Sequence, residues 1–310
     1  MSLRRLVGPL STLAALLSAC GSSSPPALQP MSAEQLNAVA RAPVEDDSLG
    51  APRSNAIPAA VPTETPEPPP TASVRVIHAC PDRAAASVDV YLGAGATTAA
   101  AAALAFRHAA GPVTVPVGEQ AVAIRAAGAA SDAAPLLAGN SPALEASQSY
   151  TVVALGLAGN TQTPLVLAAA ADDATAPEAG QARVRLLHAV AGLGAVDVCT
   201  APVAARSAAA GRAAVVAAPA RAVFANAAYG AFTDYVAVPA GAAVTLQLRV
   251  RNARPCAGLV RGTVSLTPAE GIATLVATGR VAPAANNVPR VLLVCAQGGE
   301  SAACTETPVR

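Results

Sequence analysis

The sequence contains no lysine and no tryptophan, and it has only three histidines, four tyrosines and three phenylalanines. Its 20 basic residues, all arginine, nearly balance 19 acidic ones. A nucleic-acid-binding surface needs clustered basic charge, so this balance argues against such a partner. The chain also lacks a Gly-x-Ser-x-Gly elbow, a His-Glu-x-x-His helix and a phosphate-binding loop. We therefore predict no enzymatic activity, no cofactor and no metal.

The N-terminus has the three parts of an export signal. Arg4 and Arg5 precede an apolar stretch, residues 6–17, that is too short for a bilayer-spanning helix of about 20 residues. It ends in Leu17-Ser18-Ala19-Cys20, which resembles the bacterial lipobox. In that motif the cysteine thiol receives a diacylglyceryl group before cleavage. We predict a signal peptide over residues 1–19 and lipidation of Cys20.

Lipidation would attach the protein to a membrane through two or three acyl chains. Each methylene group of these chains that is buried in the bilayer contributes about 0.8 kcal/mol to the free energy of membrane binding. No other long uncharged apolar stretch predicts a transmembrane helix. The predicted location is therefore the cell envelope. Gly21 follows the cysteine, and by the enteric sorting rule a residue other than Asp favours the outer membrane if the organism is Gram-negative.

Residues 20–72 form a Pro- and Ser-rich linker, with its densest proline run at residues 62–70. Proline removes backbone donors and favours extended conformations, so this segment cannot build a packed core. We predict a disordered N-terminal tether.

From Ser73 onward the sequence repeats itself once. Val74-Arg75-Val76-Ile77-His78-Ala79 returns as Val184-Arg185-Leu186-Leu187-His188-Ala189, and Val88-Asp89-Val90-Tyr91 returns as Val196-Asp197-Val198-Cys199. A single offset then relates further pairs, including Phe106 with Tyr229 and Thr151 with Thr274. The second copy carries an Ala/Arg-rich insertion around Pro202 to Ala222. The repeat predicts two similar domains, over residues 73–177 and 181–310.

Apolar and polar residues alternate with a period of two in both copies, which is typical of half-buried strands. Turn signals recur about every ten residues. The sequence thus predicts an all-β protein with two tandem antiparallel β-sandwich domains of immunoglobulin-like type. One stretch is ambiguous: the alanine run 99–105 has high helix propensity, and we expect a loop or a helical turn there.

These motifs resemble the bacterial family known as domain of unknown function 4397. The resemblance rests on His78-Ala79-Cys80-Pro81-Asp82 and Val88-Asp89-Val90-Tyr91, with Cys80 in place of the usual serine. The second copy keeps His188 and Val196-Asp197-Val198 but has lost the Pro-Asp turn. The resemblance extends from Ser73 to about Val294. It implies exported or surface-attached β-rich proteins, and it brings no known catalytic residues.

His78 with Asp89, and His188 with Asp197, are the repeated polar pairs. One interpretation is a His–Asp site in each domain that could hold a metal. The other is that each histidine bonds a carboxylate or backbone group and fixes strand register. A metal site needs three or four ligands, and no third is evident in either copy, which favours the structural interpretation. Asp172 and Asp173, between the repeats, are expected to be solvated.

Five cysteines follow Cys20, and an odd number leaves at least one without an intramolecular partner. Cys199 and Cys256 occur only in the second copy, so they are natural partners in an oxidising compartment. Cys295 and Cys304 flank a turn-rich stretch suited to a hairpin. We predict these two bridges with Cys80 reduced, although sequence alone leaves other pairings open.

The preferred functional hypothesis is an envelope-anchored structural or binding protein, with an envelope protein or polysaccharide as the possible partner. A cell-envelope hydrolase that uses the His/Asp pairs is the first alternative. A carbohydrate-binding module is the second, and the absence of tryptophan weakens it because such sites usually present aromatic platforms.

Overall fold

The computed structural model describes residues 67–207, 214–281, 288–298 and 303–310. The predicted signal peptide 1–19, Cys20 and most of the tether 20–72 lie outside these ranges. The predicted all-β class is confirmed: the described residues form strands, with one short 3-10 turn, η1 (Arg83–Ala85). Within the described ranges, no helix has the length and hydropathy needed to cross a membrane.

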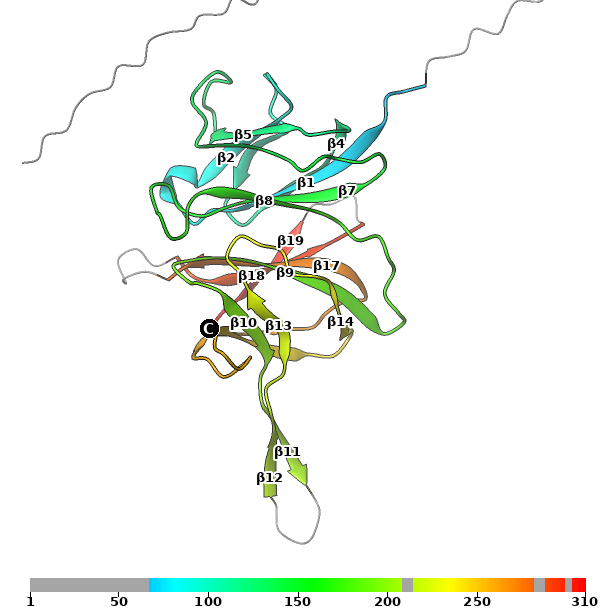
Figure 1. Ribbon diagram of the computed structural model, residues 1–310, viewed down its shortest axis with the longest axis vertical. Coiled ribbons are helices and arrows are strands. Elements are labelled where there is room, and N and C mark those ends of the chain that lie inside the picture. Colours follow the sequence, from blue (N-terminus) through cyan, green and yellow to red (C-terminus); the bar gives the residue numbers. More distant parts are fainter. Residues whose placement is uncertain (1–66, 208–213, 282–287, 299–302) are drawn as a thin grey trace, which may run out of the picture. The chain divides into compact units, whose positions relative to one another are not determined.

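The first sandwich contains two four-stranded sheets, with strand orders β4-β1-β7-β8 and β3-β2-β5-β6 (Figure 1). The strands are β1 (Thr71–Ala79), β2 (Ser87–Leu92), β3 (Ala101–Ala105), β4 (Ala109–Pro116), β5 (Ala121–Ala126), β6 (Leu137–Asn140), β7 (Ser149–Leu155) and β8 (Val166–Ala171).

The second sandwich has the same strand order in its two sheets, β14-β9-β17-β18 and β13-β10-β15-β16, and adds β19 at the edge beyond β18. Its strands are β9 (Gln181–Ala191), β10 (Val196–Thr200), β13 (Ala222–Ala227), β14 (Val236–Pro239), β15 (Val244–Val250), β16 (Val260–Leu266), β17 (Gly271–Arg280), β18 (Val291–Ala296) and β19 (Cys304–Pro308). The insertion forms a separate hairpin of β11 (Val203–Ser207) and β12 (Ala214–Ala218).

Each sandwich encloses its own apolar core, built from the inward-facing residues of both sheets. In the first, Val74 and Val76 of β1 pack with Val88 and Val90 of β2. In the second, Val184 and Leu186 take the same places in β9 and pack with Val196 and Val198 of β10. Valine and leucine at alternate positions form these cores because successive strand side chains point to opposite faces.

Among the named strands, pairing is antiparallel except between one pair of strands in each sandwich. β1 pairs in parallel with β7, and β9 pairs in parallel with β17. Parallel neighbours need a long crossover, and most of a domain separates each of these pairs in the chain. Alternation has a period of two in either case, so it cannot distinguish the two orientations.

The expectation of a loop or a helical turn in the alanine run 99–105 is wrong, because residues 101–105 form the strand β3. Leu104 pairs with Val88 and is 6 % exposed, so tertiary packing outweighs the helix propensity of the alanines. Ala103 has a φ of +49°, and its N–H donates to the Asp89 carboxylate over 2.7 Å. The strand therefore bulges at Ala103 and resumes pairing beyond it.

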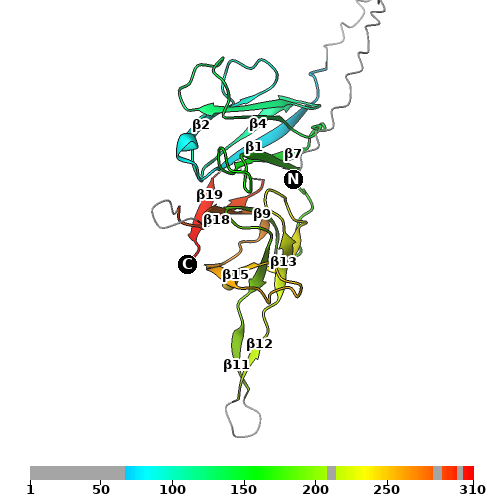
Figure 2. The same cartoon turned by 60° about the vertical axis from the view of Figure 1, so that its left-hand side comes forward.

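A third apolar cluster lies where sheet β4-β1-β7-β8 faces sheet β14-β9-β17-β18-β19 (Figure 2). Ile77 and Val153 from the first sandwich belong to it, together with Leu187, Val276 and Leu293 from the second. All five are fully buried. Both sandwiches belong to one compact unit, residues 65–310. Strands β1, β7, β9 and β17 are therefore covered on both faces.

Candidate functional site

The two repeated histidines are buried and bonded to backbone. His78 Nδ1 accepts the Cys80 N–H over 3.4 Å, and Nε2 lies 2.5 Å from the Ala85 carbonyl oxygen. His188 repeats this with the Val190 N–H at 3.4 Å and the Gly194 oxygen at 2.9 Å. A backbone N–H can only donate, so Nδ1 is unprotonated and Nε2–H donates to the carbonyl. Burial lowers the pKa of both histidines, in keeping with neutral rings.

Each of the two repeated aspartates accepts hydrogen bonds from backbone amides in the two segments that flank its own strand. Asp89 accepts the N–H groups of Ala103 and Gly128, over 2.7 and 2.9 Å. Asp197 accepts those of Asn226 and Cys256, over 2.8 and 3.1 Å. All four donors have a positive φ. The carboxylates thus hold backbone segments of left-handed conformation in place, and no hydrogen bond joins either aspartate to its repeated histidine.

The predicted disulfides Cys199–Cys256 and Cys295–Cys304 are confirmed. Cys199 and Cys295 are fully buried, and each bridge fastens a strand to a neighbouring segment. Cys80 is free and buried, and burial raises the pKa of its thiol to about 12. A thiol with that pKa is protonated at neutral pH and is a poor nucleophile.

A set of polar side chains connects the two facing sheets at the edge of the third apolar cluster. We call it the Arg–Asp cluster: Arg75, Thr151, Asp172, Arg185 and Thr274. Arg75 donates to Thr151 Oγ1 over 3.1 Å, and Arg185 donates to Thr274 Oγ1 over 3.0 Å. Asp172 accepts hydrogen bonds from Thr151 and Arg185, and its second oxygen is 4.0 Å from Arg75. One carboxylate from the link between the sandwiches therefore faces two guanidinium groups.

Burial and stacking set the electrostatics of this cluster. The side chains of Arg75 and Arg185 are 9 % and 2 % exposed. Burial lowers the pKa of Arg75, Arg185 lowers it further, and Asp172 opposes the change. The Arg185 guanidinium carbon also lies 4.5 Å from the Phe232 ring centre. Our expectation that Asp172 is solvated is wrong, because the two sandwiches enclose it.

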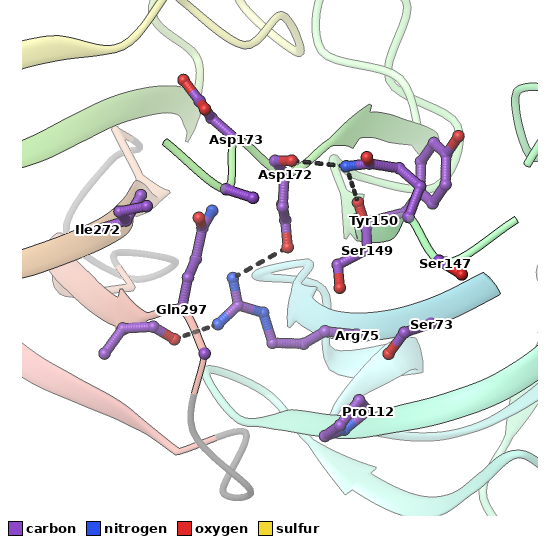
Figure 3. Close-up of a pocket in the computed structure, with 14 residues that line it drawn as sticks. Ser73, Arg75, Pro112, Ser147, Ser149, Tyr150, Asp172, Asp173, Ile272 and Gln297 are labelled. Atoms are coloured by element: carbon purple, nitrogen blue, oxygen red, sulfur yellow. Dashed lines mark hydrogen bonds and ion pairs between the residues drawn. The ribbon is translucent and has the colours of Figure 1, made fainter. Parts of the chain in front are cut away.

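A cleft of about 520 Å³ opens beside the cluster, and we call it the linker cleft. Figure 3 shows Arg75 reaching across it toward Gln297, with Asp172 above and the serines of β1 and β7 on the other side. Its polar lining includes Ser73, Ser147, Ser149, Gln148, Gln297 and Asp173. The buried Arg75 Nε and Gln297 Oε1 have no hydrogen-bond partner among the described residues. Both atoms are shielded from solvent, whereas the hydroxyls of Ser73, Ser147 and Ser149 belong to side chains that line the cleft and are not buried.

Sequence reasoning missed this cleft. Arg75 and Arg185 occupy the same position in the two repeats, and that repetition was an available signal. The same strands are apolar on both faces, for example Val152 and Val153, which is typical of strands covered on both sides. Together these two signals could have indicated a buried arginine between facing sheets.

Within the described ranges, no group of three or more His, Cys, Asp or Glu side chains is placed to hold a metal ion. His78 and Asp89 direct their polar atoms to separate backbone groups, as do His188 and Asp197. The polar side chains that line the linker cleft carry hydroxyl, amide, guanidinium and carboxylate groups.

Fold and site define an all-β protein with two packed sandwiches and a polar cleft between them. A family described as a domain of unknown function, DUF4397, matches residues 72–199. The match covers the first sandwich and continues through β9 into β10, and it includes both His78 and His188. No curated protein matches the chain significantly.

Proposed function

We propose that this protein is a lipid-anchored, non-enzymatic binding protein of the cell envelope that takes a hydroxyl-rich ligand, such as an envelope polysaccharide, in the linker cleft. The observation that carries the binding role is the set of hydroxyl-bearing side chains that line the cleft. Ser73, Ser147 and Ser149 are exposed or half-buried there, and each hydroxyl can donate and accept a hydrogen bond. A sugar hydroxyl has the same two capacities, so it can pair with any of them.

The state of the repeated histidines supports a non-enzymatic role over the hydrolase alternative. His78 and His188 are 1 % and 0 % exposed, and both nitrogens of each ring face backbone partners. A general base has to reach the proton that it abstracts. Neither ring has a free nitrogen for that purpose.

The same strand order in both sandwiches, together with the repeated His, Asp, Arg and Thr residues, supports an origin by internal duplication. In this proposal the two copies pack through equivalent sheets and create the cleft where they meet. The lipid on Cys20 and the linker up to residue 72 would hold this body away from the membrane.

Pull-down with purified peptidoglycan and a glycan array would test the binding role. Ser149→Leu places an apolar side chain in the cleft, and we expect it to abolish retention of the glycan that the wild type binds. Thr161→Leu is the matched control, because Thr161 is exposed in a loop that does not line the cleft. Equal retention by both variants would overturn the site. Release of shortened glycan products would overturn the non-enzymatic part.

Fractionation tests the anchor separately. Cys20→Ala removes the thiol that lipidation requires, so the protein should move from the membrane fraction to the soluble fraction. A variant that remains in membranes until detergent is added would contradict the proposed lipid anchor.

A further inference from the structure

The second sandwich contains an apolar cavity of about 640 Å³ between its two sheets, distinct from the linker cleft. Its walls include core residues from both sheets: Val184 and Leu275 on one side, Leu246 and Phe224 on the other. Ligand sites commonly have volumes of about 300–1,000 Å³ and mostly apolar walls. The size and lining of this cavity fit that description.

The corresponding end of the first sandwich carries a large side chain. Tyr150 pairs with Val74, whereas Ala273 pairs with Val184 at the same place in the second sandwich. Tyr150 is 4 % exposed, and its hydroxyl accepts the Glu145 N–H over 3.0 Å in the loop before β7. Ala273 has only a methyl group, so nothing equivalent extends toward the loop before β17.

The opposite sheet shows a second loss of apolar bulk at the same end. Leu92 pairs with Val122 and packs on the first core, whereas its counterpart Thr200 pairs with Leu246 and lines the cavity. Phe224 pairs with Val198 in the second sandwich and supplies an aromatic wall. The second core therefore carries less side-chain bulk than the first at this end, where Val184, Thr200 and Leu246 line the cavity.

A single cationic side chain lies at the mouth of the cavity. Arg221 is exposed, and its backbone N–H donates to Thr200 Oγ1 over 3.0 Å, which fixes the position of the chain there. Its guanidinium group has no ion-pair partner among the described residues. Arginine binds carboxylates and phosphates through charge-assisted hydrogen bonds. An apolar interior with one cation at its mouth suits an apolar chain that ends in an anionic group.

We propose that this cavity binds a single-chain anionic amphiphile of the fatty-acid type, with its alkyl chain between the sheets and its carboxylate at Arg221. Burial of alkyl surface among valine, leucine and phenylalanine side chains supplies most of the affinity. The charge of Arg221 selects the anionic end.

The test measures binding of dodecanoate to the full-length mature protein by calorimetry and by displacement of a fluorescent fatty-acid analogue. Ala273→Tyr restores the side chain that the first sandwich carries, and we expect at least about a tenfold loss of affinity. Ala138→Tyr, on the exposed β6 strand of the first sandwich, is the matched control. Ala243→Phe narrows the mouth without altering the core and should also weaken binding, so the test does not depend on the folding of one variant.

Charge selection is tested with dodecanol, which has the same chain and no charge. Arg221→Gln should weaken dodecanoate binding and leave dodecanol binding unchanged. Ser149→Leu in the linker cleft should leave dodecanoate affinity unchanged, which separates this site from the proposed glycan site. Unaltered dodecanoate affinity in both Ala273→Tyr and Ala243→Phe would overturn the cavity. Equal wild-type affinities for dodecanoate and dodecanol would overturn the role of Arg221.

Discussion

Replacement of Asp172 by asparagine tests whether one buried carboxylate holds the two sandwiches together. The substitution keeps the shape of the side chain and removes its charge. Arg75 and Arg185 would then face each other without a counter-ion, with side chains only 9 % and 2 % exposed. Removing one partner of a buried ion pair costs about 3–5 kcal/mol, because it leaves charge uncompensated in a poorly solvated place.

The expected size of the thermal effect follows from the size of the compact unit, residues 65–310. For a unit of that size, 1 kcal/mol lowers Tm by about 2–4 °C. Asp172→Asn should therefore lower Tm by about 6–20 °C in differential scanning calorimetry at neutral pH. Unfolding of the two sandwiches should also become less cooperative, because the cluster lies where they meet.

Asp173→Asn is the matched control from the adjacent position. Asp173 forms an ion pair with Arg183 over 2.6 Å, and both side chains are about a quarter exposed. Solvent screens such pairs, so the change in Tm should be several-fold smaller. If the two variants lower Tm equally, the argument from burial of the Arg–Asp cluster is refuted.

Three further predictions concern the rest of the chain. Limited proteolysis should cut first between Gly21 and Ala72 and leave a resistant core that begins near Ser73, since β1 starts at Thr71; a first stable fragment that begins inside the sandwich would contradict this boundary. Because the pKa of His188 is lowered in the native state, the native protein binds fewer protons than the unfolded chain below pH 6.5, and stability should fall on acidification. The variant His188→Gln should therefore flatten the plot of Tm against pH. An unchanged slope would argue against a buried neutral ring. Replacing both Cys199 and Cys256 by alanine opens a loop of 57 residues and should lower the free energy of unfolding in denaturant by about 4 kcal/mol. A decrease below about 1 kcal/mol would contradict the loop-entropy reasoning. Cys80 in the folded wild type should resist alkylation, because its thiol is buried and protonated.

The functional residues differ in how far sequence could reveal them. The disulfides were predictable, because Cys199 and Cys256 stand together in only one copy and Cys295 lies close to Cys304. The repetition of Asp89 and Asp197 marked them as important residues in the sequence. Their role as acceptors for backbone N–H groups was not predictable, because the donors are positive-φ residues elsewhere in the chain. The linker cleft was not predicted, since its residues come from β1, the β8–β9 link and the end of β18.

The sequence by itself determined the all-β class and, outside the alanine run, the alternation that gives strands an inward face, because alternation and turn residues act over a few neighbouring positions. Only the tertiary structure decided the parallel pairing of β1 with β7, the extended form of Ala101–Ala105 and the burial of Asp172. Each depends on segments that are distant in the chain. A carboxylate in a link is solvated or buried according to what packs over it, and in this protein the second sandwich packs over Asp172 and supplies Arg185 as its partner.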